Sequence, residues 1–218
     1  IIKWLEDIKN DAQEIYLMGD IFDFWHEWRM VVPKGFTRFF GKIAELTDND
    51  VIINFITGNH DLWTYGYLVE ELGMNVFYKE FIKEINNKKF YLAHGDGLGP
   101  NDKFFKFLKK LFTNKFLQWC FATFLHPNFA TKTAQKFSYT RNGYEKNPQF
   151  KNEEEWLIIH SREILEKEHI DYFIYGHRHI PIKINLNSKS TYIGLGDWLK
   201  NFTYAVYDGK NIEIKKFK

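Results

Sequence analysis

The sequence predicts an α/β sandwich of two mixed sheets that carries a helical insertion. In the first part of the chain, short apolar runs that stop at a glycine alternate with segments of helical spacing, as expected for strands joined by helices. The C-terminal part alternates apolar and polar residues around an Asp-Gly turn, a pattern typical of β-hairpins. The 218 residues, 44% of them hydrophobic, suffice for one well-buried core, so we expect a single domain over 1–218 with an insertion at about 101–144.

Each expected element has its own signal. Ile1, Ile2, Leu5 and Ile8 have helical spacing, which predicts a helix over about 1–11. Apolar runs that end at a glycine predict buried strands over 14–18, 51–56 and 172–175. A turn at Asn86-Asn87-Lys88 predicts a hairpin of 81–85 with 89–93. The remaining expected elements are helices at about 35–46, 68–72 and 153–168, and strands at 75–78, 191–193, 203–207 and 211–217.

A basic, aromatic segment distinguishes 101–144 from the rest of the chain. Between Lys103 and Arg141 there are eight basic residues and no acidic one, so this part carries +8 and leaves −6 on the rest of a chain of net charge +2. Eleven aromatic residues are interleaved with these charges. We expect helices with an apolar face for acyl chains and a basic face for anionic headgroups. The alternatives are a helical cover with a solvated basic face, and a nucleic-acid surface, which we do not expect.

The single cysteine limits the classes of protein. Cys120 has no partner for an internal disulfide, and no thiolate zinc pattern is present, which fits a reducing compartment. Since Cys120 stands between Trp119 and Phe121, we interpret it as a small apolar residue. The longest charge-free stretch, 116–131, is too short to span a membrane.

Residues that can bind metal ions follow four of the predicted strands. In open α/β sheets, sites form outside the carboxyl ends of the strands, so four such loops can share one cleft. A glycine directly after the predicted strands 14–18 and 172–175, and one residue beyond 51–56, lets the backbone turn sharply there. The clusters are Gly19–Asp23, Gly58–Asp61, His94–Asp96 and Gly176–His179. The histidines without such a pattern, which we interpret as ordinary surface or core residues, are His26, His126, His160 and His169.

The residue types in these clusters indicate a class of metal. Asp, Asn and His without cysteine suit Mn, Fe, Zn or Mg. A carboxylate such as Asp20 can bridge two cations, and two ions about 3.5–4 Å apart can hold the attacking and leaving oxygens of a phosphoryl group. Each cluster alone is a weak signal, because an aspartate after a strand is most often a turn or cap residue. Four clusters in this order predict a two-metal hydrolytic site.

The four clusters resemble the signature of the calcineurin-like metallophosphoesterase superfamily, GD-x-x-D, GNH-D/E, H and GH-x-H, in that order and over nearly the whole chain. The resemblance implies that Asp20 bridges two divalent ions, with Mn as the first candidate and Fe, Zn and Mg as alternatives. It also implies that Asn59, His94 and His177 complete one metal site and that His179 belongs to the other. His60 would act as general acid or electrostatic stabiliser at the leaving oxygen, held by Asp61.

One part of the superfamily signature is absent. The family begins with Asp-x-His at the end of its first strand, and no such motif precedes Gly19. Because the chain starts inside a helical pattern, we expect an N-terminal truncation that removed the first strand. The alternative is a metal-deficient relative that serves as a non-catalytic scaffold.

Further features resemble the UDP-2,3-diacylglucosamine diphosphatases of lipid A biosynthesis, namely Gly19–Trp25, an insertion after His94-Gly95-Asp96 and the closing Gly194–Trp198. The resemblance implies hydrolysis of the substrate's pyrophosphate to UMP and 2,3-diacylglucosamine 1-phosphate, by a cytoplasmic protein peripheral to the inner membrane. Asp102 and Arg141 are the expected substrate contacts, for sugar hydroxyls and phosphate. Many family members have arginine at the position of His60, which leaves room for a related substrate. A phosphodiesterase or phosphatase with a soluble substrate is the alternative.

Overall fold

The computed structural model describes residues 1–99, 103–141 and 150–218. The chain forms two compact units, Ile1–Tyr78 with Phe107–Tyr144 and Lys79–Lys106 with Glu145–Lys218. Within the described residues the structure is mixed α/β with several sheets, which confirms the predicted fold class. One feature was not expected: strands β9 and β10 pair with each other and form a separate two-stranded sheet.

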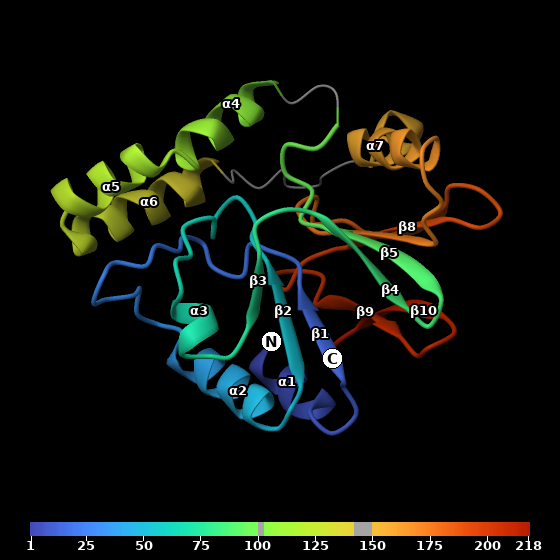
Figure 1. The fold of residues 1–218 in the computed structure, drawn as a ribbon, viewed down its shortest axis with the longest axis horizontal. Coiled ribbons are helices and arrows are strands. Elements are labelled where there is room, and N and C mark those ends of the chain that lie inside the picture. Colours follow the sequence, from blue (N-terminus) through green and yellow to red (C-terminus); the bar gives the residue numbers. More distant parts are fainter. Residues whose placement is uncertain (100–102, 142–149) are drawn as a thin grey trace. The chain divides into compact units, whose positions relative to one another are not determined.

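The first unit contains a parallel sheet in the order β1-β2-β3, formed by Glu14–Leu17, Ile52–Ile56 and Asn75–Phe77. Helices α1 (Ile2–Ile8) and α2 (Thr37–Asp48) lie side by side (Figure 1), and α3 (Tyr67–Glu70) leads into β3. The sheet and these helices share a core of fully buried side chains, which includes Leu5, Ile43, Ile53 and Phe55. All of these elements occur where the sequence predicts them, with ends shifted by a few residues.

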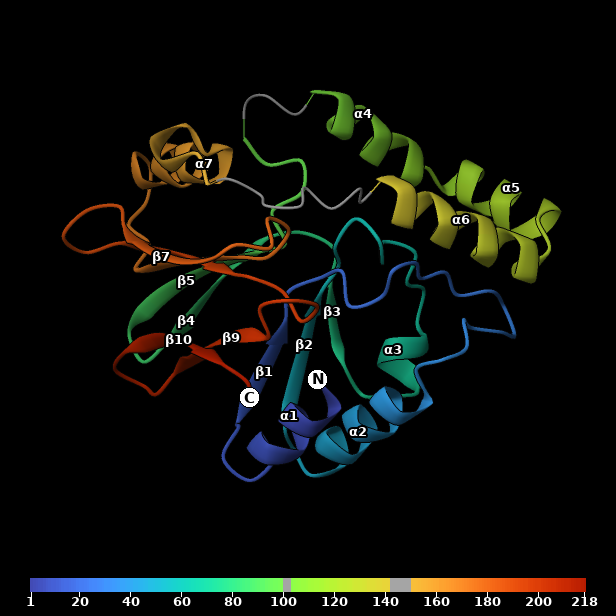
Figure 2. The same cartoon turned by 180° about the vertical axis from the view of Figure 1, so that it is seen from behind.

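Three helices account for the predicted helical segment, namely α4 (Lys103–Phe112), α5 (Lys115–Phe124) and α6 (Pro127–Arg141). Helix α5 begins at a capping residue, since the Asn114 side chain accepts hydrogen bonds from the amides of Phe116 and Leu117. Helices α4, α5 and α6 follow one another in the chain with no strand between them (Figures 1 and 2). No helix among the described residues is long and apolar enough to cross a membrane.

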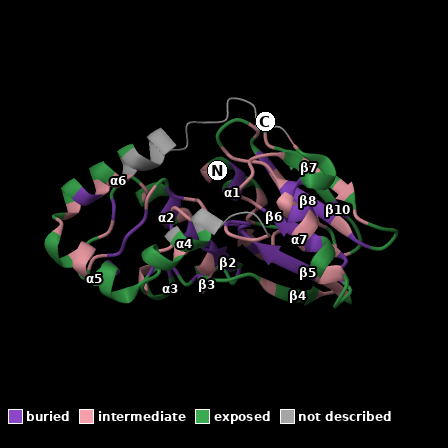
Figure 3. Cartoon of the chain, turned by 90° about the horizontal axis from the view of Figure 1, so that it is seen from above, coloured by how far each residue is buried: buried purple, intermediate pink, exposed green. Residues whose placement is uncertain are grey.

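Helices α5 and α6 expose several large aromatic side chains. Phe116, Trp119, Phe124 and Phe129 are 67%, 56%, 73% and 62% exposed, and exposed positions cover much of α5 and α6 in Figure 3. An inner aromatic residue, Phe121, packs edge-on against Trp63 with ring centroids 4.7 Å apart. The described part of the segment therefore has aromatic side chains both packed against Trp63 of the same unit and exposed to solvent. Cys120, the chain neighbour of Trp119 and Phe121, is partly buried, as expected for a small apolar residue.

His26 lies in an aromatic cluster that joins the loop after β1 to helix α5. It is 1% exposed, its ring stacks on Trp28 and Phe121 at centroid distances of 4.3 and 5.3 Å, and both ring nitrogens lack a hydrogen-bond partner. Burial therefore lowers the pKa of His26 to about 4. It is a neutral core histidine, as the sequence predicts.

The pH dependence of stability should reveal this histidine. The unfolded chain takes up a proton at His26 below about pH 6.5, whereas the folded chain stays neutral there down to about pH 4. This contribution to stability is therefore present above pH 6.5 and lost as the pH falls toward 4, at about 1.4 kcal/mol per pH unit. The free energy of unfolding, measured with urea at several pH values between 7 and 4.5, should depend less steeply on pH in His26→Phe than in the wild type. The control His169→Phe, at a half-exposed side chain, should keep the wild-type dependence; equal slopes in both variants would refute the assignment.

The second unit contains a five-stranded mixed sheet in the order β4-β5-β6-β8-β7. Its strands are Phe81–Ile85, Lys88–Ala93, Tyr172–Tyr175, Thr191–Leu195 and Pro181–Asn185, respectively. The β4–β5 hairpin turns at Asn86 and Asn87, both with positive φ, so Lys88 belongs to the strand rather than to the turn. Strand β7 was not predicted, because it opens with a proline and has only two apolar residues in alternation.

Helix α7 (Trp156–Leu165) packs on this sheet. Leu157 and Ile158 form one buried cluster with Phe173, Tyr175 and Tyr192, and buried residues run along β5 and parts of α7 in Figure 3. A short 3₁₀ turn (Asn152–Glu154) precedes the helix, and the predicted C-terminal hairpin is confirmed as β9 (Thr203–Tyr207) and β10 (Ile212–Lys216). The sheet core thus fixes the loops that follow β5 and β6.

Candidate metal-binding residues

The loops after β1 and β2 approach each other closely in the first unit. Asp20 has a φ of 54°, in the left-handed region, and its Oδ1 accepts a hydrogen bond from the His60 amide at 3.0 Å. A Cβ on Gly58 would lie 2.2 Å from that same Oδ1 and 2.6 Å from the Asp20 amide nitrogen. Glycine at position 58 is therefore required by the neighbouring loop, because any side chain would displace Asp20.

Asp61 connects the same two loops through its side-chain carboxylate. It is fully buried, and its carboxylate accepts hydrogen bonds from the Gly58 amide at 2.6 Å and the Ile21 amide at 2.8 Å. Each bond fixes one loop, so Asp61 determines where Asp20 and His60 lie. Removing its carboxylate group would leave both amides without their acceptor.

His60 is oriented by a backbone group. Its Nδ1 lies 3.0 Å from the Asp23 carbonyl oxygen, which can only accept, so Nδ1 carries a hydrogen and Nε2 is the nitrogen that binds or releases a proton. Nε2 lies 3.9 Å from the Asp20 carboxylate. The sequence led us to expect that Asp61 holds this ring, whereas the contact observed at Nδ1 is with Asp23.

Asn59 shows a feature expected of a metal ligand. Its side-chain Oδ1 is buried and has no hydrogen-bond partner. A buried amide oxygen without a donor costs about 1–3 kcal/mol, and a divalent cation would remove that cost because carbonyl oxygens are suitable ligands for such ions. Together with the Asp20 carboxylate, the first unit thus offers two oxygen ligands that fit a divalent ion.

Gly58→Ala should test the contact between the two loops. The added methyl group collides with Asp20, so we expect divalent-ion affinity to fall at least about tenfold, as it does when a residue supporting a ligand is lost. The matched control is Gly41→Ala in α2, where a Cβ would meet nothing within 4 Å; this variant should bind metal normally. Isothermal titration calorimetry with Mn²⁺ measures the affinity of both variants. An affinity in Gly58→Ala equal to that of the wild type would contradict the requirement for glycine at position 58.

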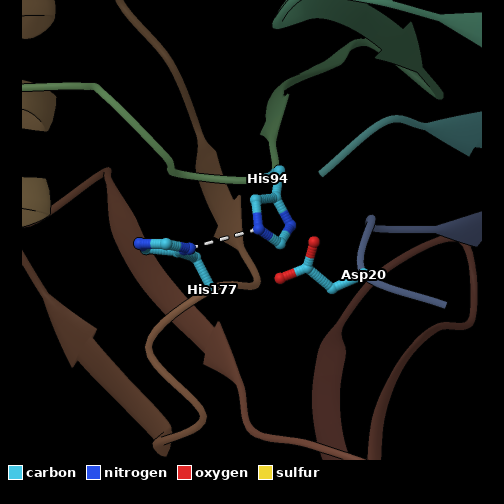
Figure 4. A group of neighbouring side chains, drawn as sticks. All are labelled: Asp20, His94 and His177. Atoms are coloured by element: carbon cyan, nitrogen blue, oxygen red, sulfur yellow. Dashed lines mark hydrogen bonds between the residues drawn. The ribbon is translucent and has the colours of Figure 1, made fainter. Parts of the chain in front are cut away.

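In the second unit, two predicted ligands meet. His94 follows β5 and is 3% exposed, and its Nε2 lies 3.2 Å from Nδ1 of His177, which follows β6 (Figure 4). Two nitrogens bound to one ion at about 2.1 Å, with an angle of 90–110° between them, stand about 3.0–3.4 Å apart. The observed separation therefore fits a shared ion.

The loop that carries His177 and His179 is held in an unusual conformation. Both histidines have positive φ, 57° and 54°, which is uncommon for residues with a side chain. Between them, Arg178 makes a two-pronged contact with the fully buried Glu155, at 3.0 Å from Nε and 3.2 Å from Nη2, and stacks over the Trp156 ring at 4.6 Å. These contacts hold the loop against α7.

His179 faces a carboxylate of the following loop. Its Nδ1 lies 3.8 Å from Asp197 Oδ2, and Asn201 donates both to that oxygen and to the His179 carbonyl. Burial raises the pKa of the Asp197 carboxyl, but hydrogen bonds from the amides of Lys200, Asn201 and Leu199 outweigh it and leave that pKa below its ordinary value. Asp197 is therefore an anion that favours a cation or a protonated imidazole beside it.

The structure places the predicted residues as two groups, one in each unit. The first holds Asp20, Asn59, His60 and Asp61, and the second holds His94, His177 and His179. Asp102 lies outside the described residues, and so does the side chain of Arg141. Sequence reasoning missed the Arg178–Glu155 pair, although Arg178 stands inside the Gly176–His179 motif; no sequence signal connects it to a glutamate 23 positions earlier.

Comparisons with known proteins agree on one family. A profile described as calcineurin-like phosphoesterase matches residues 1–181. The chain is 38% identical to a UDP-2,3-diacylglucosamine hydrolase of Porphyromonas gingivalis over 230 aligned residues, which cover 99% of this chain and 87% of that protein. Proteins of the same name from Tolumonas auensis and Proteus mirabilis are 26% and 25% identical, covering 98% and 99% of this chain and 87% and 90% of theirs.

Proposed function

Since the chain belongs to the calcineurin-like phosphoesterase family, we propose that it hydrolyses the pyrophosphate of UDP-2,3-diacylglucosamine, yielding UMP and 2,3-diacylglucosamine 1-phosphate. The observation that carries this proposal is the similarity to a UDP-2,3-diacylglucosamine hydrolase along 99% of the chain. The helical segment at 103–141 supports a lipid substrate, because a soluble phosphodiester would not require so many exposed aromatic side chains.

The family uses divalent metal ions, and the ligands proposed here are Asp20, Asn59, His94, His177 and His179. Asp20 of the first unit would bridge two ions, for which Mn²⁺ is our first choice over Fe, Zn and Mg. The fit of the donors supports this assignment, since Asn59 Oδ1 lacks a hydrogen-bond partner and the nitrogens of His94 and His177 are 3.2 Å apart. Two bound ions would stabilise the charge that develops on the phosphoryl oxygens.

The chain's own residues orient the substrate and supply a proton. With Nδ1 occupied by the Asp23 carbonyl, His60 can present Nε2–H to the oxygen that leaves phosphorus. Asp61 keeps this histidine and Asp20 in place through the amides of Gly58 and Ile21. Asp102 and Arg141 remain our proposed contacts for sugar hydroxyls and phosphate.

The helices α4–α6 are proposed to contact lipid. Exposed aromatic rings on α5 and α6 stand among exposed lysines, namely Lys110 at the end of α4, Lys115 on α5, and Lys132 and Lys136 on α6. Each basic residue near an anionic membrane surface contributes about 1 kcal/mol, and burial of apolar side chains adds to it. The protein would then work as a peripheral protein on the cytoplasmic face of the inner membrane.

Substrate comparison tests the proposal against a soluble-substrate phosphodiesterase. Purified protein with Mn²⁺ should turn over UDP-2,3-diacylglucosamine with a kcat/KM at least about 10³-fold above that for bis(p-nitrophenyl) phosphate, because only the lipid uses the remote binding surface. Equal values would favour a soluble substrate, and no turnover of either compound would favour a non-catalytic scaffold.

A further inference from the structure

The corner between α4 and α5 is hydrogen-bonded to the loop that carries His60, within the first unit. Phe112 ends α4, so its carbonyl oxygen receives no amide hydrogen from that helix. Two side chains donate to this oxygen instead, the indole Nε1–H of Trp63 and the Nε2–H of Gln118 on α5, each at 2.7 Å. Trp63 stands three positions after His60. One carbonyl therefore joins both helices to residues 58–65, which we call the His60 loop.

Ring packing strengthens this connection. The Trp63 ring lies edge-on to Phe121 of α5 and to Phe112, with centroids 4.7 and 6.1 Å apart. Phe121 and Gln118 are three positions apart and so lie on the same side of the helix. Phe116, which is 67% exposed, lies on the opposite side, since each residue turns a helix by about 100°. Helix α5 thus contacts the His60 loop with one side and exposes an aromatic ring on the other.

The His60 loop is held independently by the segment that follows β1. The Trp25 amide donates to the His60 carbonyl at 3.0 Å, and the Glu27 amide donates to the Trp63 carbonyl at 3.2 Å. Glu27 is 8% exposed, and its carboxylate also accepts a hydrogen bond from the amide of Tyr65. Loss of the indole hydrogen bond would therefore free the helical corner, while His60 keeps its position.

We propose that Trp63 is a positioning residue, which fixes the lipid-contacting helices relative to His60 and thereby places the phosphate of a lipid-anchored substrate at His60 Nε2. The role assigned to Trp63 rests on the proposed function, in which one substrate uses both α5 and His60. Binding at a remote surface accelerates a reaction only if that surface is fixed relative to the reacting group. A small phosphodiester has no acyl chains on the helices, so its turnover does not depend on the indole hydrogen bond.

Trp63→Phe separates the hydrogen bond from the ring packing, because it keeps an aromatic ring and removes the indole N–H. We expect kcat for UDP-2,3-diacylglucosamine to fall about tenfold, as for a misplaced substrate. Turnover of bis(p-nitrophenyl) phosphate should stay within about twofold of the wild type, whereas general damage to the fold would lower both.

Trp28→Phe is the matched control. Trp28 stacks on His26 at 4.3 Å in the same aromatic cluster, and its buried Nε1 has no hydrogen-bond partner in the part of the chain that the structure describes. This variant therefore loses an indole N–H that donates to no acceptor, and it should match the wild type on both substrates. A tenfold loss on the lipid in Trp28→Phe as well would assign the effect to packing and overturn the role of the hydrogen bond.

Hydrogen exchange measures the connection without turnover, on the full chain. In Trp63→Phe the amides of residues 112–121 should exchange about fivefold faster than in the wild type, because the helical corner has lost one hydrogen bond. The amides of residues 58–62 should keep their rate, since the segment after β1 still holds them. Trp28→Phe should change neither segment by more than about twofold.

Unchanged exchange at residues 112–121 in Trp63→Phe would overturn the proposal, as would an equal loss of turnover on both substrates. Failure of the proposed function gives a different result. If the wild type leaves UDP-2,3-diacylglucosamine intact while Trp63→Phe loosens residues 112–121 alone, Trp63 still fixes the helices relative to His60, and the substrate it serves is another one.

Discussion

His177→Ala should abolish nearly all hydrolysis of UDP-2,3-diacylglucosamine, lowering kcat/KM by at least about 10³-fold. The reason is that the remaining ligand, His94, loses the nitrogen 3.2 Å away with which it would share an ion. Stabilisation of phosphoryl charge by metal ions is worth several kcal/mol, and about 1.4 kcal/mol corresponds to each factor of ten. Steady-state kinetics of UMP release measures the effect.

The control for this prediction is His169→Ala, which removes a half-exposed imidazole whose Nε2 lies 3.5 Å from Asp171 Oδ1. It should leave kcat/KM within about twofold, as expected for a surface substitution away from the site. Metal content of both variants, measured by atomic emission, separates lost ligation from lost folding. A His177→Ala protein that keeps its metal and its activity would remove this residue from the site.

The second large effect concerns the exposed aromatic face. A triple variant with Phe116, Trp119 and Phe124 replaced by serine should bind anionic lipid vesicles at least about 10²-fold more weakly, because each buried aromatic side chain contributes about 1.5–3 kcal/mol. Its KM for the diacyl substrate should rise, while turnover of a small phosphodiester stays the same. Vesicle sedimentation and kinetics on the two substrates measure these changes.

Met30 and Val31 provide the matched control, since they are 87% and 50% exposed and lie outside the helices. Replacing both with serine should leave vesicle binding and KM unchanged. If the helical variant loses activity equally on the lipid and on the small phosphodiester, its aromatic residues support the fold rather than the lipid, and the membrane proposal fails.

Much of this architecture could be predicted because buried strands leave a clear pattern. Runs such as 51–56 and 172–175 are apolar and end at a glycine, and both became strands whose following loops carry the candidate ligands. The same signal failed for β7, where Ile182 and Ile184 alternate with polar residues and the strand depends on pairing with β8.

The sequence predicted which residues form the candidate site, but not the contacts that hold those residues in place. The motifs identify Asp20, His94 and His177, yet nothing in a sequence shows that Gly58 must be a glycine because Asp20 lies against it. Nor does periodicity reveal that Glu155 is buried to hold Arg178 between two histidines. Such contacts join residues from separate loops, and only the folded chain determines them.

Metal dependence of UMP release tests the central claim most directly. The full-length protein is stripped with chelator, dialysed and assayed on purified UDP-2,3-diacylglucosamine before and after Mn²⁺ is restored, with UMP quantified by chromatography. The account predicts no UMP from the stripped protein and recovery of one UMP per 2,3-diacylglucosamine 1-phosphate when Mn²⁺ returns. UMP release that persists at the same rate in the stripped, metal-free protein would contradict it, as would a metal-restored protein that leaves this substrate intact.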